Sequence, residues 1–100
     1  PSEYIVFPQA SLRDAAGCLR TLGHPMRLRV LLLLENARLM VGAWSEICEL
    51  RSHVASEHLR LMMHCVFITR EKKGEKSNDQ IAEPHVFSIL ACIKPRMNNT

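Results

Sequence analysis

The sequence predicts a mainly helical α+β fold, with five helices and one β-hairpin in its C-terminal half. Hydrophobic residues make up 47% of the 100 residues but aromatic ones only 5%. The core must therefore be built from aliphatic side chains, and this favours packed helices over a β-sandwich. A β-rich stretch at residues 66–70 precedes a charged turn around Gly74 and a segment that can return, which is typical of a hairpin. A chain of this length is expected to form one domain.

A short arm, residues 1–10, is expected to precede a folded domain at residues 11–94. The apolar cluster Tyr4 to Phe7 within the arm is bounded by prolines and cannot fold alone. It could pack on the body of the domain or on a second subunit. Residues 95–100 are expected to form a frayed tail.

The first two helices are predicted from their apolar spacing and from the residues at their ends. Ser11 is expected to cap a helix with one apolar stripe that continues to Leu22, and Gly23 is expected to end it in a left-handed conformation. The next helix begins at Pro25, because proline at the first helical position sacrifices no hydrogen bond. This helix is apolar nearly all round as far as Leu34, so it should lie at the centre of the fold.

A short helix at residues 42–50 and a longer one from Ser52 follow, joined by a tight turn. In the short helix Trp44, Ile47 and Cys48 are expected to point inward. The longer helix, capped by Ser52, has an apolar side and a polar side. The apolar side carries Ala55, His58, Leu59 and Met62, and the polar side carries His53, Ser56, Glu57 and Arg60. A polar helix face preceded by a short helix and a turn is what a helix-turn-helix presents to the major groove of DNA.

The remaining elements are the hairpin and a closing helix. The hairpin has a basic tip, and its return strand at residues 77–82 is weak because Ser77, Asn78 and Asp79 have poor strand propensity. A link at residues 38–41 could form an edge strand. Pro84 is expected to open the last helix, and Pro95 to stop it.

Charge and hydropathy narrow the class of protein. Thirteen basic and ten acidic residues give a net charge of +3, which permits an anionic partner without requiring one. The longest apolar run, Val30 to Leu34, is far too short to cross a bilayer, and no charged-then-apolar leader opens the chain. We therefore expect a soluble, cytoplasmic protein with no membrane association.

The four cysteines are scattered without a Cys-x-x-Cys motif, which favours reduced thiols over a disulfide framework. They are Cys18, Cys48, Cys65 and Cys92. Cys65 follows His64, but adjacent residues on a helix point about a hundred degrees apart, so they are poorly placed to act as nucleophile and base. We expect no enzyme.

Three stretches of the sequence are distinctive: residues 22–31 (LGHPMRLRVL), residues 56–62 (SEHLRLM) and residues 69–74 (TREKKG). In that order they resemble the opening signature, the core of the recognition helix and the wing of the ArsR-type bacterial transcriptional repressors. That family consists of winged helix-turn-helix proteins with an added helix at each end. The resemblance extends over roughly residues 12–93. The first two motifs together are fairly specific, whereas the wing alone is weak.

The resemblance implies a homodimer whose first and last helices pack against their mates, with two recognition helices entering successive major grooves of a pseudo-palindromic operator in double-stranded DNA. It also implies an inducer that loosens DNA binding. Carried over residue by residue, the contacts to DNA fall on Ser52, His53, Ser56, Arg60, Arg70, Lys72, Lys73 and Lys76. The competing interpretation of these residues is a solvated helix face and a solvated hairpin tip.

The metal sites found in part of this family are not matched. The Cys-x-Cys positions look like Met40 and Gly42, and although Glu83 and His85 match the first half of a second site, its other half falls on Arg96 and Asn99. We therefore expect no metal and no cofactor. A thiol switch remains an option, since Cys18 and Cys92 lie on the two helices implied to form the dimer interface. The alternative for these cysteines is a structural role in the core.

Several positions depart from the family pattern in ways that bear on DNA binding. Trp44 stands where a leucine is usual, and Asn78-Asp79 replaces a pair of aromatics. Val66 replaces a turn glycine, which would require either a positive φ or a rearrangement of the chain there. An alternative function follows: a protein- or ligand-binding module on a winged-helix scaffold that has lost DNA binding. The apolar patch for that role would be Trp44, Met63, Val66 and Phe87. Simple repacking of the same residues is the competing explanation.

Overall fold

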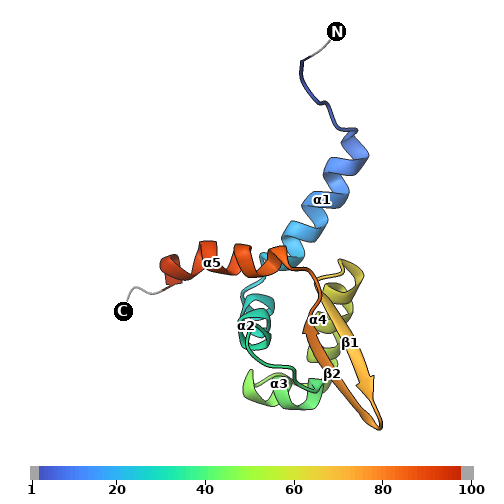
Figure 1. The fold of residues 1–100 in the computed structure, drawn as a ribbon, viewed down its shortest axis with the longest axis vertical. Coiled ribbons are helices and arrows are strands. Elements are labelled where there is room, and N and C mark those ends of the chain that lie inside the picture. The colour runs from blue at the N-terminus through green and yellow to red at the C-terminus, as the bar shows by residue number, and fades with distance from the viewer. Residues whose placement is uncertain (1–2, 98–100) are drawn as a thin grey trace.

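The computed structural model describes residues 3–97, and within them the predicted five helices and antiparallel hairpin are confirmed (Figure 1). The elements follow the expected order. They are α1 (Gln9–Leu22), α2 (Pro25–Leu34), α3 (Val41–Ile47), α4 (Ser52–His64), β1 (Ile68–Lys73), β2 (Lys76–Ile81) and α5 (His85–Met97).

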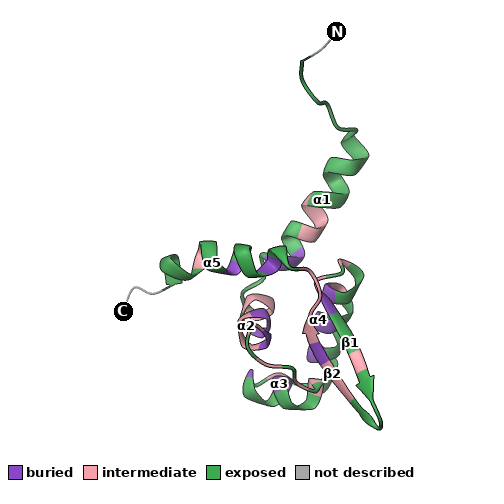
Figure 2. Cartoon of the chain, in the orientation of Figure 1, coloured by how far each residue is buried: buried purple, intermediate pink, exposed green. Residues whose placement is uncertain are grey.

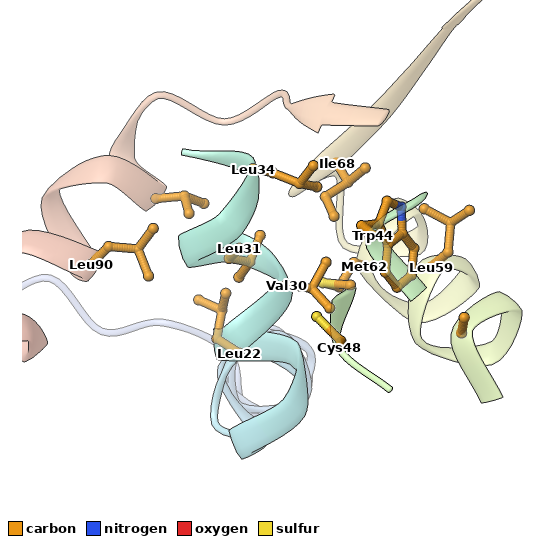
Figure 3. Close-up of a cluster of buried hydrophobic side chains, with 12 residues drawn as sticks. Leu22, Val30, Leu31, Leu34, Trp44, Cys48, Leu59, Met62, Ile68 and Leu90 are labelled. Carbon is orange, nitrogen blue, oxygen red and sulfur yellow. The ribbon is translucent and has the colours of Figure 1, made fainter. Parts of the chain in front are cut away.

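Helix α2 lies at the centre of the core, as its nearly uniform apolar character predicts. The His24 side chain caps it by accepting a hydrogen bond from the Met26 backbone N–H (3.1 Å), and Pro25 occupies the first turn. Figure 3 shows Leu31 facing Leu90 of α5, while Val30 faces Met62 of α4. The core therefore joins the helix-turn-helix unit to the closing helix through α2.

The helix-turn-helix unit consists of α3, a tight turn and α4. Glu49 adopts a positive φ of 57° in the turn, and the Leu50 N–H donates to the Ser45 carbonyl (2.8 Å). The prediction that Ser52 caps α4 is wrong. The extended residue before the helix is Arg51, which provides no side-chain cap, so Ser52 is already the first helical residue.

The hairpin pairs β1 with β2 from Ile68↔Ile81 to Lys73↔Lys76, and Gly74 takes the left-handed conformation (φ 63°) that the turn requires. The weak return strand predicted from residues 77–82 therefore forms. The link at 38–41 contributes less than an edge strand, because only Leu39 pairs, exchanging backbone hydrogen bonds with Asp79.

The ends of the outer helices differ from their predicted positions. Helix α1 begins at Gln9, after Pro8, rather than at a cap on Ser11. Gly23 closes α1 with φ −75°, because its N–H bonds the Leu19 and Arg20 carbonyls without a left-handed turn. Helix α5 continues through Pro95 to Met97. A proline in the last turn removes one backbone hydrogen bond, and the Arg96 side chain bonds the Cys92 carbonyl there. The rest of the predicted tail, 98–100, lies outside the described residues.

Both outer helices are mostly exposed, and α1 projects away from the body (Figures 1 and 2). In α1 only Thr21 and Leu22 are buried, whereas Leu12 and Leu19 are 50% and 64% exposed. The apolar stripe predicted for this helix therefore lies largely in solvent within one chain. The apolar residues Tyr4 to Phe7 of the arm are exposed as well.

Candidate nucleic-acid interface

Helix α4 presents a polar face to solvent because its apolar stripe is fixed to the core. Ala55 and Met62 are fully buried and Leu59 is 6% exposed. The opposite side carries the four residues implied as DNA contacts, all of them exposed: Ser52, His53, Ser56 and Arg60. The structure thus brings these four side chains onto one accessible helix face.

Arg60 is held along this face by Glu57 of the preceding turn. Its Nε donates to Glu57 Oε2 at 3.1 Å, and a second nitrogen donates to Oε1. The guanidinium lowers the pKa of Glu57, and the carboxylate raises the pKa of Arg60. Both side chains are more than half exposed. A phosphate could therefore replace the carboxylate as the partner of Arg60 at little structural cost.

His58, which lies on the buried side of α4 as predicted, contributes to the packing of α4 against α2. Arg27 of α2 donates from Nε to His58 Nδ1 (3.1 Å) and from Nη1 to the Thr21 carbonyl (3.3 Å), and so connects three helices. Burial lowers the pKa of His58, and the nearby positive charges of Arg27 and His24 lower it further. The role of Arg27 was missed by the sequence analysis, although a charge that interrupts an apolar helix was its visible signal.

The wing presents its lysines at the tip of the hairpin. Lys72, Lys73 and Lys76 are all exposed, and Lys73 Nζ lies 3.7 Å from Glu71 Oε1. Arg70 is directed differently from the expected outward contact, because its Nε donates to Asp79 Oδ1 at 3.0 Å. Only part of this guanidinium remains available to a partner.

Asp79 is a fully buried carboxylate with a second donor, the Trp44 indole N–H, at 2.8 Å from Oδ2. Because Trp44 is completely buried, its predicted place in an exposed apolar patch is wrong. Met63, Val66 and Phe87 are exposed, but Phe87 instead lines a surface hollow of about 300 Å³ with Leu34 and Ile81. The four residues therefore do not form one surface.

The cysteines are all free thiols, and the structure pairs them differently from the sequence hypothesis. Cys18 Sγ lies 2.7 Å from Cys65 Sγ, whereas Cys92 is exposed on α5 beside Arg96. Cys48 belongs to the buried core. The predicted switch pair of Cys18 and Cys92 is not brought together within the chain.

Glu83 and His85 form a local contact at the start of α5. Glu83 Oε1 accepts from the His85 backbone N–H (3.1 Å) and lies 2.6 Å from His85 Nδ1. These hydrogen bonds lower the pKa of Glu83. Within residues 3–97, no group of three or more histidine, cysteine or acidic side chains is arranged to hold a metal ion. Over the same range no helix has the length and hydropathy needed to cross a membrane.

The arrangement of a short helix, turn and exposed helix beside a two-stranded hairpin defines a winged helix-turn-helix domain. No family model matches the sequence. The chain is 33% identical over 86 residues to the transcriptional repressor PagR of Bacillus anthracis, a match that covers 85% of this chain and 86% of PagR. It is 26% identical over 84 residues to the transcriptional repressor SmtB of Mycobacterium tuberculosis, covering 83% of this chain but spanning only 62% of SmtB.

Solved structures agree with these relatives. The crystal structure of PagR has a TM-score of 0.72 and 31% identity, and the match covers 87% of this chain and all of that one. A homodimeric winged helix-turn-helix DNA-binding domain from Mycobacterium bovis has a TM-score of 0.78 over 97% of this chain and 91% of its own, but at 20% identity it bears on the fold alone. The chain belongs to the ArsR/SmtB family of winged helix-turn-helix transcriptional regulators.

Proposed function

We propose that this protein is a transcriptional repressor that binds double-stranded DNA as a homodimer, on a pseudo-palindromic operator. The observation that carries the proposal is the exposed polar face of α4. The buried apolar stripe of the same helix packs on the core, and the wing beside it has lysines at its tip. Its relatives PagR and SmtB are transcriptional repressors. A regulator of this kind is not an enzyme, and it would act in the cytoplasm.

The polar face and the wing would have different tasks on DNA. Serine hydroxyls and the ring N–H of His53 are short donors that can reach base edges or phosphates from the first turns of α4. The wing lysines would lie along the adjacent backbone, where each neutralised phosphate releases counterions. Affinity should accordingly fall steeply as the salt concentration rises.

The homodimer would use the apolar surface that α1 and α5 leave in solvent. Leu12 and Leu19 on α1, with Ile89 and Met97 on α5, are between 36% and 64% exposed. Both helices lie at the end of the molecule opposite α3 and the tip of the hairpin (Figure 1). A dimer built there would leave both α4 faces free to reach DNA.

The test of this function is the fluorescence anisotropy of labelled duplex DNA, random and palindromic, titrated with the protein at two salt concentrations. We expect binding to labelled duplex DNA that weakens strongly at the higher salt concentration. Absence of binding at low salt to both duplexes would reject the proposal.

Replacing Arg60 with alanine should weaken binding to every duplex by roughly 1–3 kcal/mol and reduce the salt dependence, because one phosphate-binding cation is lost. The matched control is Arg96→Ala, which removes an exposed arginine from the end of α5, remote from α4 and the wing (Figure 1). Equal affinities for wild type and Arg60→Ala at low salt would remove Arg60 from the interface.

A further inference from the structure

The two sulfurs that approach each other belong to helices with different positions in the fold. Cys18 lies in the second half of α1, and Cys65 caps the C-terminal end of α4, 47 residues later in the sequence. Their Sγ atoms are 2.7 Å apart, and Cys65 Sγ is also 3.8 Å from Thr21 Oγ1. Both thiols are partly exposed. An S–S bond is about 2.05 Å long, so the two sulfur atoms lie within about 1 Å of bonding distance.

Small molecules can reach this pair from solvent. The two cysteines line an open surface groove of about 540 Å³ together with Arg13, Asp14, Thr21 and His64. A compact oxidant fits easily in such a space. Neither of the other two cysteines combines solvent access with a nearby thiol. Cys48 is only 2% exposed in the core, and Cys92 is exposed but has no thiol neighbour among the described residues.

We propose that Cys18 and Cys65 are an oxidation site, at which a hydroperoxide converts the two thiols into a disulfide that ties α1 to the end of α4. The thiolate of one cysteine attacks the peroxide oxygen, and the O–O bond breaks to give a sulfenic acid and an alcohol, or water from hydrogen peroxide. The second thiol then attacks the sulfenic sulfur, and water leaves as the S–S bond forms. The two cysteines together lose two electrons and two protons.

The surroundings of the pair set its reactivity. The hydrogen bond with Cys65, partial burial and the negative charge of Asp14 raise the pKa of Cys18. Thiolates are the reactive form, so the rate of crosslinking should increase as the pH rises above neutral. A thiol–disulfide reagent or a reductant should restore the original dithiol, because the second cysteine resolves the sulfenic acid before further oxidation.

The crosslink would change how α1 is held. Within one chain α1 buries little besides Thr21 and Leu22, so few contacts fix its direction relative to α4. A covalent bond four residues before Leu22 would fix that direction. The proposal concerns the oxidation state and the attachment of α1, and it stands whether or not the protein binds DNA.

The experiment treats the reduced full chain with a slight excess of hydrogen peroxide, blocks remaining thiols, and maps the product by peptide mass spectrometry. We expect a Cys18–Cys65 peptide, two blocked thiols at Cys48 and Cys92, and reversal by a reductant. Cys65→Ser should abolish the crosslinked peptide, whereas the control Cys92→Ser should leave it unchanged. Crosslinks that involve mainly Cys48 or Cys92, or four thiols that all remain free, would overturn the proposal.

Thermal unfolding provides a second readout. Closing a loop of this length should raise the melting temperature of oxidised wild type by at least about 8 °C over the reduced form. The Cys65→Ser variant should have the same melting temperature after treatment with the oxidant as in its reduced form. A crosslinked wild type that melts at the reduced temperature would contradict the claim that the bond fixes α1 to α4.

Discussion

Asp79 illustrates at the residue scale how two unusual positions can stabilise each other. Its side chain has no exposed surface, yet both carboxylate oxygens have donors, Trp44 and Arg70. Its backbone also exchanges hydrogen bonds with Leu39. A buried charge is tolerated when it is paired and fully hydrogen-bonded. Through its side chain and its backbone, Asp79 therefore connects α3, strand β1 of the wing and the link before α3.

Replacing Asp79 with alanine should lower the free energy of unfolding by roughly 1.5–3 kcal/mol, because the buried Trp44 N–H loses its acceptor and Arg70 its ion pair. Urea unfolding monitored by tryptophan fluorescence measures this directly. Asn78→Ala, one position earlier on the same strand, is the control and should change stability by less than about 0.5 kcal/mol. Similar losses for both variants would show that the Asp79 pairing is not what stabilises this region.

Val66 adopts φ 61°, which is the first of the two alternatives that its family glycine position left open. A β-branched residue in that region is strained. It is 66% exposed, so glycine there loses little packing. Val66→Gly should therefore raise the free energy of unfolding by about 1 kcal/mol. Ser56→Gly, in the interior of α4, should instead lower it by about 0.5 kcal/mol. Chemical denaturation of the three proteins compares them; a destabilised Val66→Gly would contradict the argument from strain.

The sequence predicted whole elements better than their ends and their cross-connections. Apolar periodicity located α1 and α4, because spacing along one helix decides which side is buried. Helix α2 was located instead by Pro25 at its start and by its nearly uniform apolar character. The cap at Ser52 was misplaced because Arg51 already has the extended conformation before the helix. The Trp44–Asp79 and Cys18–Cys65 contacts were missed because each joins residues more than 30 positions apart. Separately, Trp44 and Asp79 each looked like departures from the family, and only their contact explains both.

The contact between α2 and α4 should depend on pH through His58. Its folded-state pKa lies below the usual value, so as pH falls below about 6.5 the unfolded chain binds a proton that the folded chain does not. Protonation at Nδ1 would also displace the hydrogen bond from Arg27. The free energy of unfolding is therefore expected to decrease as the pH falls from about 7.5 to 5.5.

His58→Gln should reduce this pH dependence, since glutamine retains an acceptor for Arg27 and does not titrate. Urea unfolding at several pH values gives the slope for each protein. His53→Gln, on the exposed face of the same helix, is the control and should keep the wild-type slope. If His58→Gln and wild type lose stability in parallel, another group causes the pH dependence. His24, Arg27 and Glu57 are the charged or titratable groups next to His58.

At the scale of the whole molecule, the protein is a small core with two outer helices that one chain leaves largely uncovered (Figure 2). Among residues 3–97, thirteen large hydrophobic residues are exposed, and six of them lie on the arm and α1. An exposed apolar surface concentrated on particular elements is typical of a protein that associates with another. This distribution supports the proposed homodimer.

Replacing both Leu12 and Leu19 with glutamate should convert the dimer into monomers, because charged side chains would be buried without partners at the interface. Sedimentation velocity measures the change. Met63→Glu, an exposed apolar residue at the end of α4, should leave the dimer intact. A dimer that survives the double substitution would place the interface elsewhere.

The Arg60–Glu57 pair has a consequence for how the protein would search DNA. Because the two charges neutralise each other, the exposed face of α4 contributes little long-range attraction. Residues 70–76 of the wing hold four basic and two acidic residues and so keep a net charge of +2, which attracts DNA at longer range. Association with DNA and recognition of the correct site would then depend on different elements. The wing would set the association rate and its salt sensitivity, and α4 would engage only where the local geometry lets a phosphate replace Glu57, which would lengthen residence on the correct site.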